Sequence, residues 1–362
     1  MTAEKYAIGD TEAQPAHTDA AAETLQSDLL QGVSRTFALT IPQLPQPLAR
    51  AVSNAYLLCR IADTIEDEPA LSSEQKAYFC DQFLNVVAGN VSAQLFAAEL
   101  HPLLSQTTLA SERELVYHTA RVIGITRSLN EIQRHAIENC IRTMARGMAE
   151  FQINASPHGL RELAQLDRYC YYVAGVVGEM LTRLFCDHAA DIARHREDMM
   201  LLAVSFGQGL QMTNILKDVW DDRERGACWL PQQTFIGHGF DLQHLTPGCG
   251  DAGFIDGLGD LIGVTHGHLK NALAYTLLIP SRHAGIRRFC LWAIGMAVLT
   301  LRKLNKRRDF SSGDEVKISR SSVKATVLLT ALLGHSDAML KLLFMSAGAG
   351  LPLTPVKVTR LG

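Results

Sequence analysis

Apolar residues recur at intervals of three and four through most of the chain from about Leu25 onward. The spacing is clear at Leu48, Val52 and Tyr56, and it gives each predicted helix one apolar face. Alternating runs of β-branched residues are scarce, so strands are not indicated. The pattern predicts an all-α fold. Because no linker divides the periodic part, we expect a single domain over residues 25–345.

Helix-breaking residues separate the periodic segments. They gather at residues 42–47, 68–69, 154–158 and 231–259, and the last stretch is the longest and is rich in glycine. Residues 1–24 are polar and rich in alanine, so we expect a disordered N-terminal tail. Residues 346–362 are predicted to form a C-terminal tail.

Composition narrows the class of protein. Hydrophobic residues make up 47% of the 362 residues, charged residues 20%, and the net charge is −3. This balance argues against nucleic acid as the main partner, because phosphates are neutralised by clustered Lys and Arg. The eight cysteines have no CxxC pair and are expected to be reduced core residues. With no apolar core behind basic residues at the start, we expect a cytoplasmic protein.

Two apolar segments, residues 290–301 and 325–344, are the nearest candidates for membrane spans. Neither reaches the length of a charge-free span, so both are expected to be buried or interfacial helices. The basic run at residues 302–308 is interpreted as a solvated helix end. The alternative is contact with a phosphate or an anionic membrane, so a peripheral membrane position through the C-terminal helices stays open.

A first polar helix face carries Tyr56, Arg60, Asp63 and Asp67, which step by four, three and four. These side chains share one face of a helix, where the two carboxylates repel each other. A magnesium ion would relieve this repulsion, because Mg²⁺ uses one or two carboxylates together with waters and substrate phosphates. The alternative is a solvated acidic helix end with an Arg–Asp pair.

A second polar face carries Gln211, Asn214, Asp218 and Asp222 inside an otherwise apolar segment. Its alternative explanation is a hydrogen-bond network between helices. Two such faces in one chain favour the binding of several Mg²⁺ ions around a diphosphate, where the metal would stabilise the leaving group. Ionisation of an allylic diphosphate leaves a carbocation, which requires a dry, apolar and aromatic pocket.

The chain resembles the squalene and phytoene synthases. The matching stretches are DTIED at 63–67, NILKDVWDD at 214–222, SRTF at 34–37, YCYYVAGVVG at 169–178 and GACWLP at 226–231. Together they extend the resemblance over roughly residues 30–345 in family order. The resemblance implies a single-domain isoprenoid synthase helical bundle with a central cavity.

The resemblance also implies roles for individual residues. Those expected to hold Mg²⁺, directly or through water, are Asp63, Glu66, Asp67, Asn214, Asp218 and Asp222. Those expected to contact diphosphate are Ser34, Arg35, Tyr56, Arg60, Gln211 and Lys217. Tyr169 would assist ionisation or proton transfer, while Phe37, Phe289 and Tyr275 would line the path of the cation. Lys217 and Ala227 depart from the family pattern, in which basic residues, often Arg at the first position, are common.

Two C-terminal stretches resemble squalene synthases in particular: residues 288–290 and residues 316–318, with Arg320 just after. They imply that Lys317 and Arg320 contact NADPH. The implied reaction joins two farnesyl diphosphates head to head into presqualene diphosphate, then reduces and rearranges it to squalene, a precursor in sterol or hopanoid biosynthesis. Two alternatives stay open: a phytoene or dehydrosqualene synthase without reductant, and a non-catalytic isoprenoid-binding helical protein. Prenyl chain length and oligomeric state are not determined.

A GxGxxG match at residues 248–253 has no predicted strand before it. A dinucleotide-binding turn requires that strand, so we interpret the match as a loop.

Overall fold

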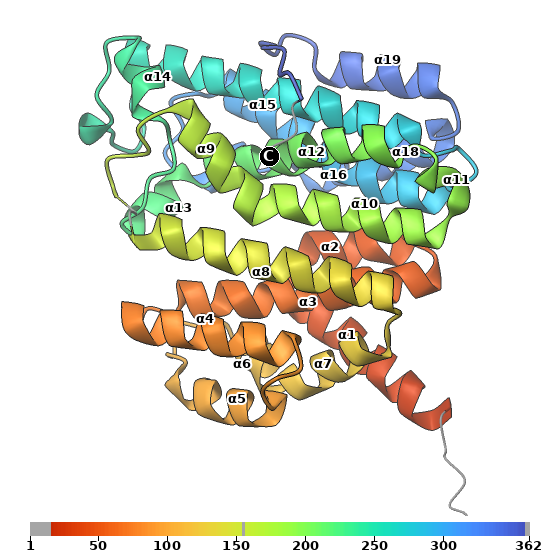
Figure 1. Cartoon of the computed structure of the whole chain (residues 1–362). Coiled ribbons are helices and arrows are strands. Elements are labelled where there is room, and N and C mark those ends of the chain that lie inside the picture. The colour runs from red at the N-terminus through yellow and green to blue at the C-terminus, as the bar shows by residue number, and fades with distance from the viewer. Residues whose placement is uncertain (1–15, 154–155, 359–362) are drawn as a thin grey trace, which may run out of the picture.

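The computed structural model describes residues 16–153 and 156–358, and these residues are helical apart from their connections (Figure 1). They contain no strand, only one isolated bridge between Leu160 and Pro231. The all-α prediction is therefore confirmed. The N-terminal part consists of α1 (Ala16–Val33), α2 (Arg35–Thr40), α3 (Gln46–Asp67), α4 (Ser73–Val87), α5 (Ala93–Leu100), α6 (Ala110–Tyr117) and α7 (Thr119–Ser128).

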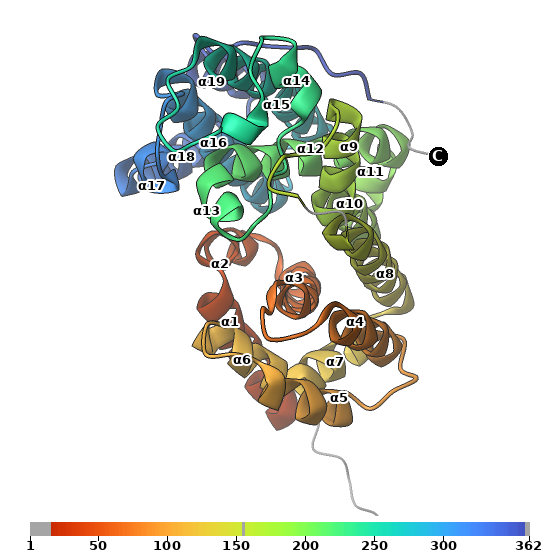
Figure 2. The same cartoon turned by 90° about the vertical axis from the view of Figure 1, so that its left-hand side faces the viewer.

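The larger C-terminal part surrounds two long helices, α12 and α15, which pack along each other. In Figure 2 it lies above α1–α7, and α8 runs along one side of both parts. Its helices are α8 (Glu131–Ile153), α9 (Leu163–Cys170), α10 (Val176–His188), α11 (Ala190–Ala193), α12 (Arg196–Lys217), α13 (Val219–Glu224), α14 (Gln232–Ile236), α15 (Ala252–Leu278), α16 (Ala284–Lys306), α17 (Gly313–Val316), α18 (Arg320–Leu333) and α19 (Asp337–Ala347).

Glycines allow α10 and the turn before it to approach α12 closely. A π-helical turn, Tyr171–Gly175, joins α9 to α10. A Cβ atom on Gly178 would lie 2.2 Å from the Ala203 carbonyl oxygen, and one on Gly207 would lie 2.2 Å from that of Ala174. Only glycine permits backbones to pack this closely. The glycines of the 169–178 motif therefore set the distance between Tyr169 and the second carboxylate face.

The predicted break over residues 231–259 is too long. Helix α15 begins at Ala252, where the Asp251 side chain accepts from the backbone N–H of Gly253 at 2.8 Å. Its early glycines are used for packing rather than for breaking: a Cβ on Gly257 would lie 2.6 Å from the Phe235 ring. Tertiary contacts here outweigh the low helix propensity of glycine. Gly248 and Gly250 do lie in a loop, as expected for the GxGxxG match.

The helical region extends further than expected at both ends. Helix α1 begins at Ala16, before the expected start at Leu25, and α19 continues to Ala347. The expected tail over residues 1–15 lies outside the described residues. Beyond α19 the chain lies along α15, where the Thr354 N–H donates to the Gly263 carbonyl at 3.0 Å. The assignment of residues 1–24 and 346–362 as tails stays a prediction.

One described helix, α16, is long and apolar enough to cross a membrane by its length and composition alone. Most of its apolar stretch is buried within the protein, where α16 packs against α12, α15 and α18. A core helix meets the same test of length and composition, so the sequence-based expectation of a buried helix here agrees with its packing.

Candidate active site

The first carboxylate face lies at the C-terminal end of α3. Asp63 is partly exposed, with 31% of its side chain accessible, and Asp67 is exposed one turn later. Arg60 lies 3.7 Å from the Asp63 carboxylate and also forms an ion pair with Glu112 of α6. The ion pair with Glu112 holds the guanidinium beside the carboxylate face, which fits the expected role of Arg60 in contacting diphosphate.

The second carboxylate face was expected on one uninterrupted helix, but the structure divides it between two helices. Helix α12 ends at Lys217 and α13 begins at Val219, with a local distortion at Asp218. Two i→i+4 hydrogen bonds nevertheless continue through it: Asp218 N–H to the Asn214 carbonyl at 2.8 Å and Asp222 N–H to the Asp218 carbonyl at 2.9 Å. The predicted face therefore survives the distortion. Lys217 lies 2.9 Å from the Asp218 carboxylate.

The two amides of this face are open rather than engaged. Asn214 is exposed and Gln211 is partly exposed. Within the described part of the chain neither side chain forms a hydrogen bond, so the alternative explanation, a network between helices, is not observed there. Polar side chains on an open face are available to a ligand.

The two faces approach each other closely enough to interact electrostatically. Burial raises the pKa of Asp222 to about 6, and neighbouring Asp218, Asp221 and Asp67 raise it further, while Arg225 opposes them. Although Asp67 is exposed to solvent, desolvation by the surrounding protein also raises its pKa, again against Arg225. Arg225 therefore lies within range of a carboxylate from each helix.

Asp63 is the most perturbed of these acids. Burial raises its pKa to about 7; Asp67 and Glu112 add to the shift, and Arg60 opposes it. A raised pKa shows that the folded protein disfavours the ionised form. A cation bound beside Asp63 would favour that form.

The donor set fits magnesium bound together with a substrate. No three His, Cys, Asp or Glu side chains of the described residues converge on a single metal position. Mg²⁺ commonly takes only one or two protein carboxylates and completes its octahedron with water and phosphate oxygens. The repelling carboxylates Asp63, Asp67 and Asp222 would be stabilised by such an ion.

Tyr169 is held by aromatic contacts next to both faces. Its ring stacks on Trp229 with centroids 4.0 Å apart and planes 9° apart, and Phe151 contacts it edge-on at 5.4 Å. Burial raises the pKa of Tyr169 well above its usual value, and the charges of Glu66 and Asp222 add to the effect. The phenol is therefore protonated at neutral pH and can donate a hydrogen bond.

The SRTF segment covers the start of the same region. The Ser34 hydroxyl caps α2 by accepting the Phe37 N–H at 3.0 Å. The Phe37 ring lies 4.9 Å from the ring of Tyr56, whose hydroxyl donates to the Val33 carbonyl at 3.4 Å. Arg35 begins α2, but its side chain is outside what the structure describes.

The two remaining predicted aromatic residues lie deep in the core. Tyr275 on α15 is buried and its hydroxyl is 2.9 Å from Thr182, which satisfies it. Phe289 on α16 is buried and packs edge-on against Phe185. Their roles along a cation path stay predictions.

The segment expected to bind NADPH lies beside the second face. A Cβ on Gly313 would lie 3.2 Å from the Lys217 carbonyl and 3.4 Å from the Asp218 carboxylate. Lys317 and Arg320, just beyond, are exposed. The fold therefore brings Gly313, at the start of this segment, next to the carboxylate site, while the Lys317 ammonium pairs with Asp314 at 3.1 Å.

Three site residues were not assigned roles from the sequence: Glu112, Arg225 and Trp229. Glu112 and Arg225 belong to no motif and are brought in by packing. Trp229 lies within the 226–231 motif, so the sequence placed it near the site, but the sequence did not predict that its ring stacks on Tyr169.

Comparison with known proteins agrees with this geometry. The family model for squalene/phytoene synthase matches residues 30–322. A squalene synthase from Cochliobolus lunatus is 30% identical over 59% of this chain and 49% of its own length, and one from Nicotiana benthamiana is 29% identical over 84% and 67%. The matched region thus spans about half the length of the first of these relatives.

Among solved structures, TcSQS in complex with the ligand BPH1237 has a TM-score of 0.72 and 24% identity, covering 91% of this chain and 92% of its own. That likeness confirms the predicted isoprenoid synthase type of helical fold. Because the family model covers most of the chain and its motifs form the two carboxylate faces, this protein belongs to the squalene/phytoene synthase family.

Proposed function

We propose that this protein is a magnesium-dependent squalene synthase. It would join two farnesyl diphosphates head to head into presqualene diphosphate, and then convert this intermediate to squalene with hydride from NADPH. Squalene synthases among its relatives support the choice of product. The residues at 316–320 support the use of a reductant.

One observation carries the proposal: carboxylates from two separate helices approach each other while their charge is unrelieved. Asp67 raises the pKa of Asp222 across the gap between the two helices, and the pKa of each of these acids stays raised although Arg225 opposes the shift. Carboxylates with strongly perturbed pKa values are concentrated at functional sites, where a bound ligand can stabilise their ionised form. Bound magnesium would stabilise the negative charge on the departing diphosphate.

The protein's own residues would perform the other tasks. Arg60 and Lys217 would hold the diphosphate oxygens, since both lie beside a carboxylate that is expected to bind metal. The Tyr169 phenol, protonated and fixed by Trp229, would donate to the leaving oxygen. The apolar core around Phe289 would exclude water from the cation.

Product analysis tests the reaction. Purified protein is incubated with Mg²⁺ and farnesyl diphosphate, with and without NADPH, and products are identified by mass spectrometry. Geranylgeranyl diphosphate is assayed in parallel. Squalene formed only with NADPH supports the proposal. A C30 product unaffected by NADPH, or a C40 product, indicates a dehydrosqualene or phytoene synthase instead, and no product with either substrate refutes a catalytic role.

A matched pair of variants tests the site. Asp222→Asn should lower turnover by roughly 10³-fold, because metal stabilisation of a leaving group contributes several kcal/mol. Asp198→Asn, exposed near the other end of α12, removes the same charge away from the site and should leave turnover unchanged. Equal turnover of the two variants would contradict a metal-binding role for Asp222.

A further inference from the structure

The C-terminal helices α18 and α19 expose large apolar side chains on their outer face. Leu328 and Leu332 on α18 are 60% and 67% exposed, and Leu342 and Met345 on α19 are 57% and 68% exposed. No described residue packs over these four side chains. A helix at a water-exposed surface normally carries polar residues on its outer face. Contact of this apolar face with water is therefore unfavourable.

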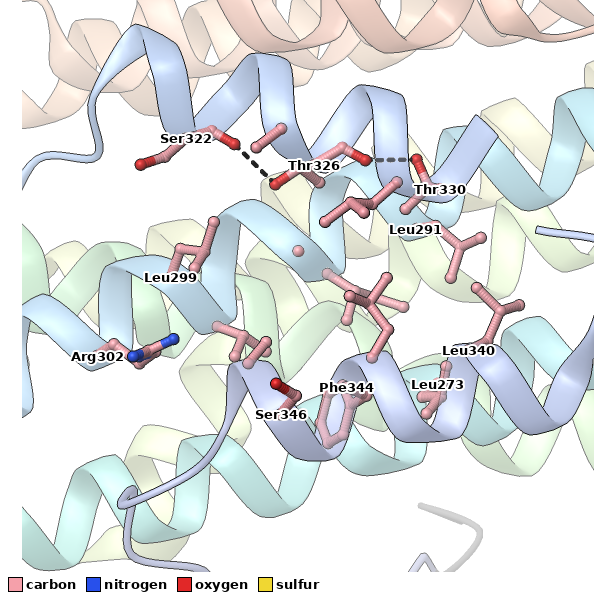
Figure 3. Close-up of a pocket in the computed structure, with 17 residues that line it drawn as sticks. Leu273, Leu291, Leu299, Arg302, Ser322, Thr326, Thr330, Leu340, Phe344 and Ser346 are labelled. Atoms are coloured by element: carbon pink, nitrogen blue, oxygen red, sulfur yellow. Dashed lines mark hydrogen bonds between the residues drawn. The ribbon is translucent and has the colours of Figure 1, made fainter. Parts of the chain in front are cut away.

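The inner faces of the same helices line an apolar pocket. The pocket has a volume of about 300 Å³ and lies between α16, α18 and α19 (Figure 3). It is separate from the carboxylate faces of α3, α12 and α13. Its volume is at the small end for ligand sites, about 300–1,000 Å³, which suits a segment of one hydrocarbon chain.

The hydroxyl groups in the pocket wall do not require a polar ligand. Thr326 donates to the Ser322 carbonyl at 3.0 Å, and Thr330 donates to the Thr326 carbonyl at 2.7 Å. The Trp292 indole N–H in turn donates to the Thr330 hydroxyl at 2.9 Å. With these hydrogen bonds made within the protein, the wall presents mainly carbon atoms.

The charges around the pocket are positive. Arg302 lines one end of it (Figure 3) and pairs with no described residue. Lys324 on α18 and Lys341 on α19 are exposed. The only acid on these two helices, Asp337, is engaged by Arg287 at 2.7 Å. An apolar face bordered by unpaired cations is complementary to a bilayer that contains anionic lipids.

We propose that α18 and α19 form a docking surface for an anionic lipid bilayer. Leu328, Leu332, Leu342 and Met345 would enter the boundary between headgroups and acyl chains, with Lys324 and Lys341 at the phosphates. The pocket would accept part of one acyl chain, with Arg302 next to its headgroup. This surface does not depend on the proposed reaction, because its residues lie outside the carboxylate site.

Vesicle co-sedimentation of the full chain tests the proposal. The protein should sediment with vesicles of phosphatidylcholine containing about one-third phosphatidylglycerol, and much less with phosphatidylcholine alone or at high salt. Leu332→Asp/Met345→Asp should weaken binding by about 100-fold, roughly tenfold for each apolar side chain withdrawn. Lys324→Glu/Lys341→Glu should weaken it by at least about 25-fold, roughly fivefold for each lysine.

Matched variants on the opposite part of the molecule serve as controls. Leu95→Asp/Leu109→Asp alters two side chains that are 70% and 60% exposed on or beside other helices. Arg121→Glu/Arg127→Glu makes the same change in net charge on α7. Both should bind vesicles like the wild type, and all four variants should retain the wild-type circular dichroism spectrum and product formation in detergent.

Four outcomes would overturn the proposal. One is that the wild type does not bind anionic vesicles. Another is that the control variants lose binding as strongly as the α18–α19 variants. The third is that light scattering without lipid shows a dimer that Leu332→Asp/Met345→Asp dissociates, which would assign the face to a second copy of the chain. Photo-crosslinking from a diazirine-bearing acyl chain should label peptides of α16, α18 and α19, and labelling confined to other helices would equally refute the assignment.

Discussion

Replacing Gly207 with alanine should push α12 away from the π-helical turn between α9 and α10, and these two elements position the active site. The new Cβ would lie 2.2 Å from the Ala174 carbonyl oxygen, whereas ordinary contact begins near 3.4 Å. The atom in the way is backbone in the π-helical turn, so it cannot rotate aside. Overpacking of this kind costs about 1–3 kcal/mol, and the better helix propensity of alanine returns at most about 1 kcal/mol.

We therefore expect Gly207→Ala to lower the free energy of unfolding by about 1–2 kcal/mol. It should also lower turnover by up to about 100-fold, because a displacement of about 1 Å is enough to disturb catalytic alignment. Urea denaturation and steady-state product formation measure the two effects separately.

Gly124→Ala provides the matched control. Gly124 lies within α7, and a Cβ there would meet nothing within 4 Å. The control should be as stable as the wild type or more stable by up to about 1 kcal/mol, with unchanged turnover. If Gly207→Ala behaves like Gly124→Ala in both assays, the close approach of the helices does not constrain the site.

Three further predictions concern single residues. Asp63→Asn should stabilise the metal-free protein near neutral pH: a folded pKa of about 7 against an ordinary value of 3.8 means that stability present at low pH is lost as pH rises through this range. In the presence of chelator, the melting temperature of Asp63→Asn should fall less between pH 4 and pH 8 than that of the wild type or of Asp198→Asn. Identical dependence on pH in all three proteins would contradict the prediction. Trp229→Leu removes the stack on Tyr169 and should reduce kcat by roughly tenfold with little change in KM; a change confined to KM would argue against positioning. Lys317→Ala should raise the KM for NADPH and leave formation of presqualene diphosphate unchanged, and an equal loss in both steps would contradict a cofactor role.

Much of the site could be predicted from local sequence, because helical periodicity is a local property. Positions 56, 60, 63 and 67 share a face on any helix, and positions 211, 214, 218 and 222 do so even across the distortion at Asp218.

Tertiary packing determines the contacts between residues that are distant in the sequence, and helical periodicity carries no information about them. Sequence spacing cannot show that Arg225 lies within electrostatic range of carboxylates from two helices or that Glu112 pairs with Arg60, because these interactions join segments that are distant in the sequence. It also misplaced the start of α15, where packing of glycines against Phe235 outweighs their helix-breaking tendency.

The C-terminal helices show most clearly where prediction from the sequence alone ends. The sequence showed that residues 325–344 are apolar but interrupted by charged residues, and it predicted a buried or interfacial position for them. Only the folded arrangement decided that one apolar face of α18 and α19 lines a pocket and the other is exposed. A helix that is apolar on most sides has no preferred inner face until neighbouring helices cover one of them.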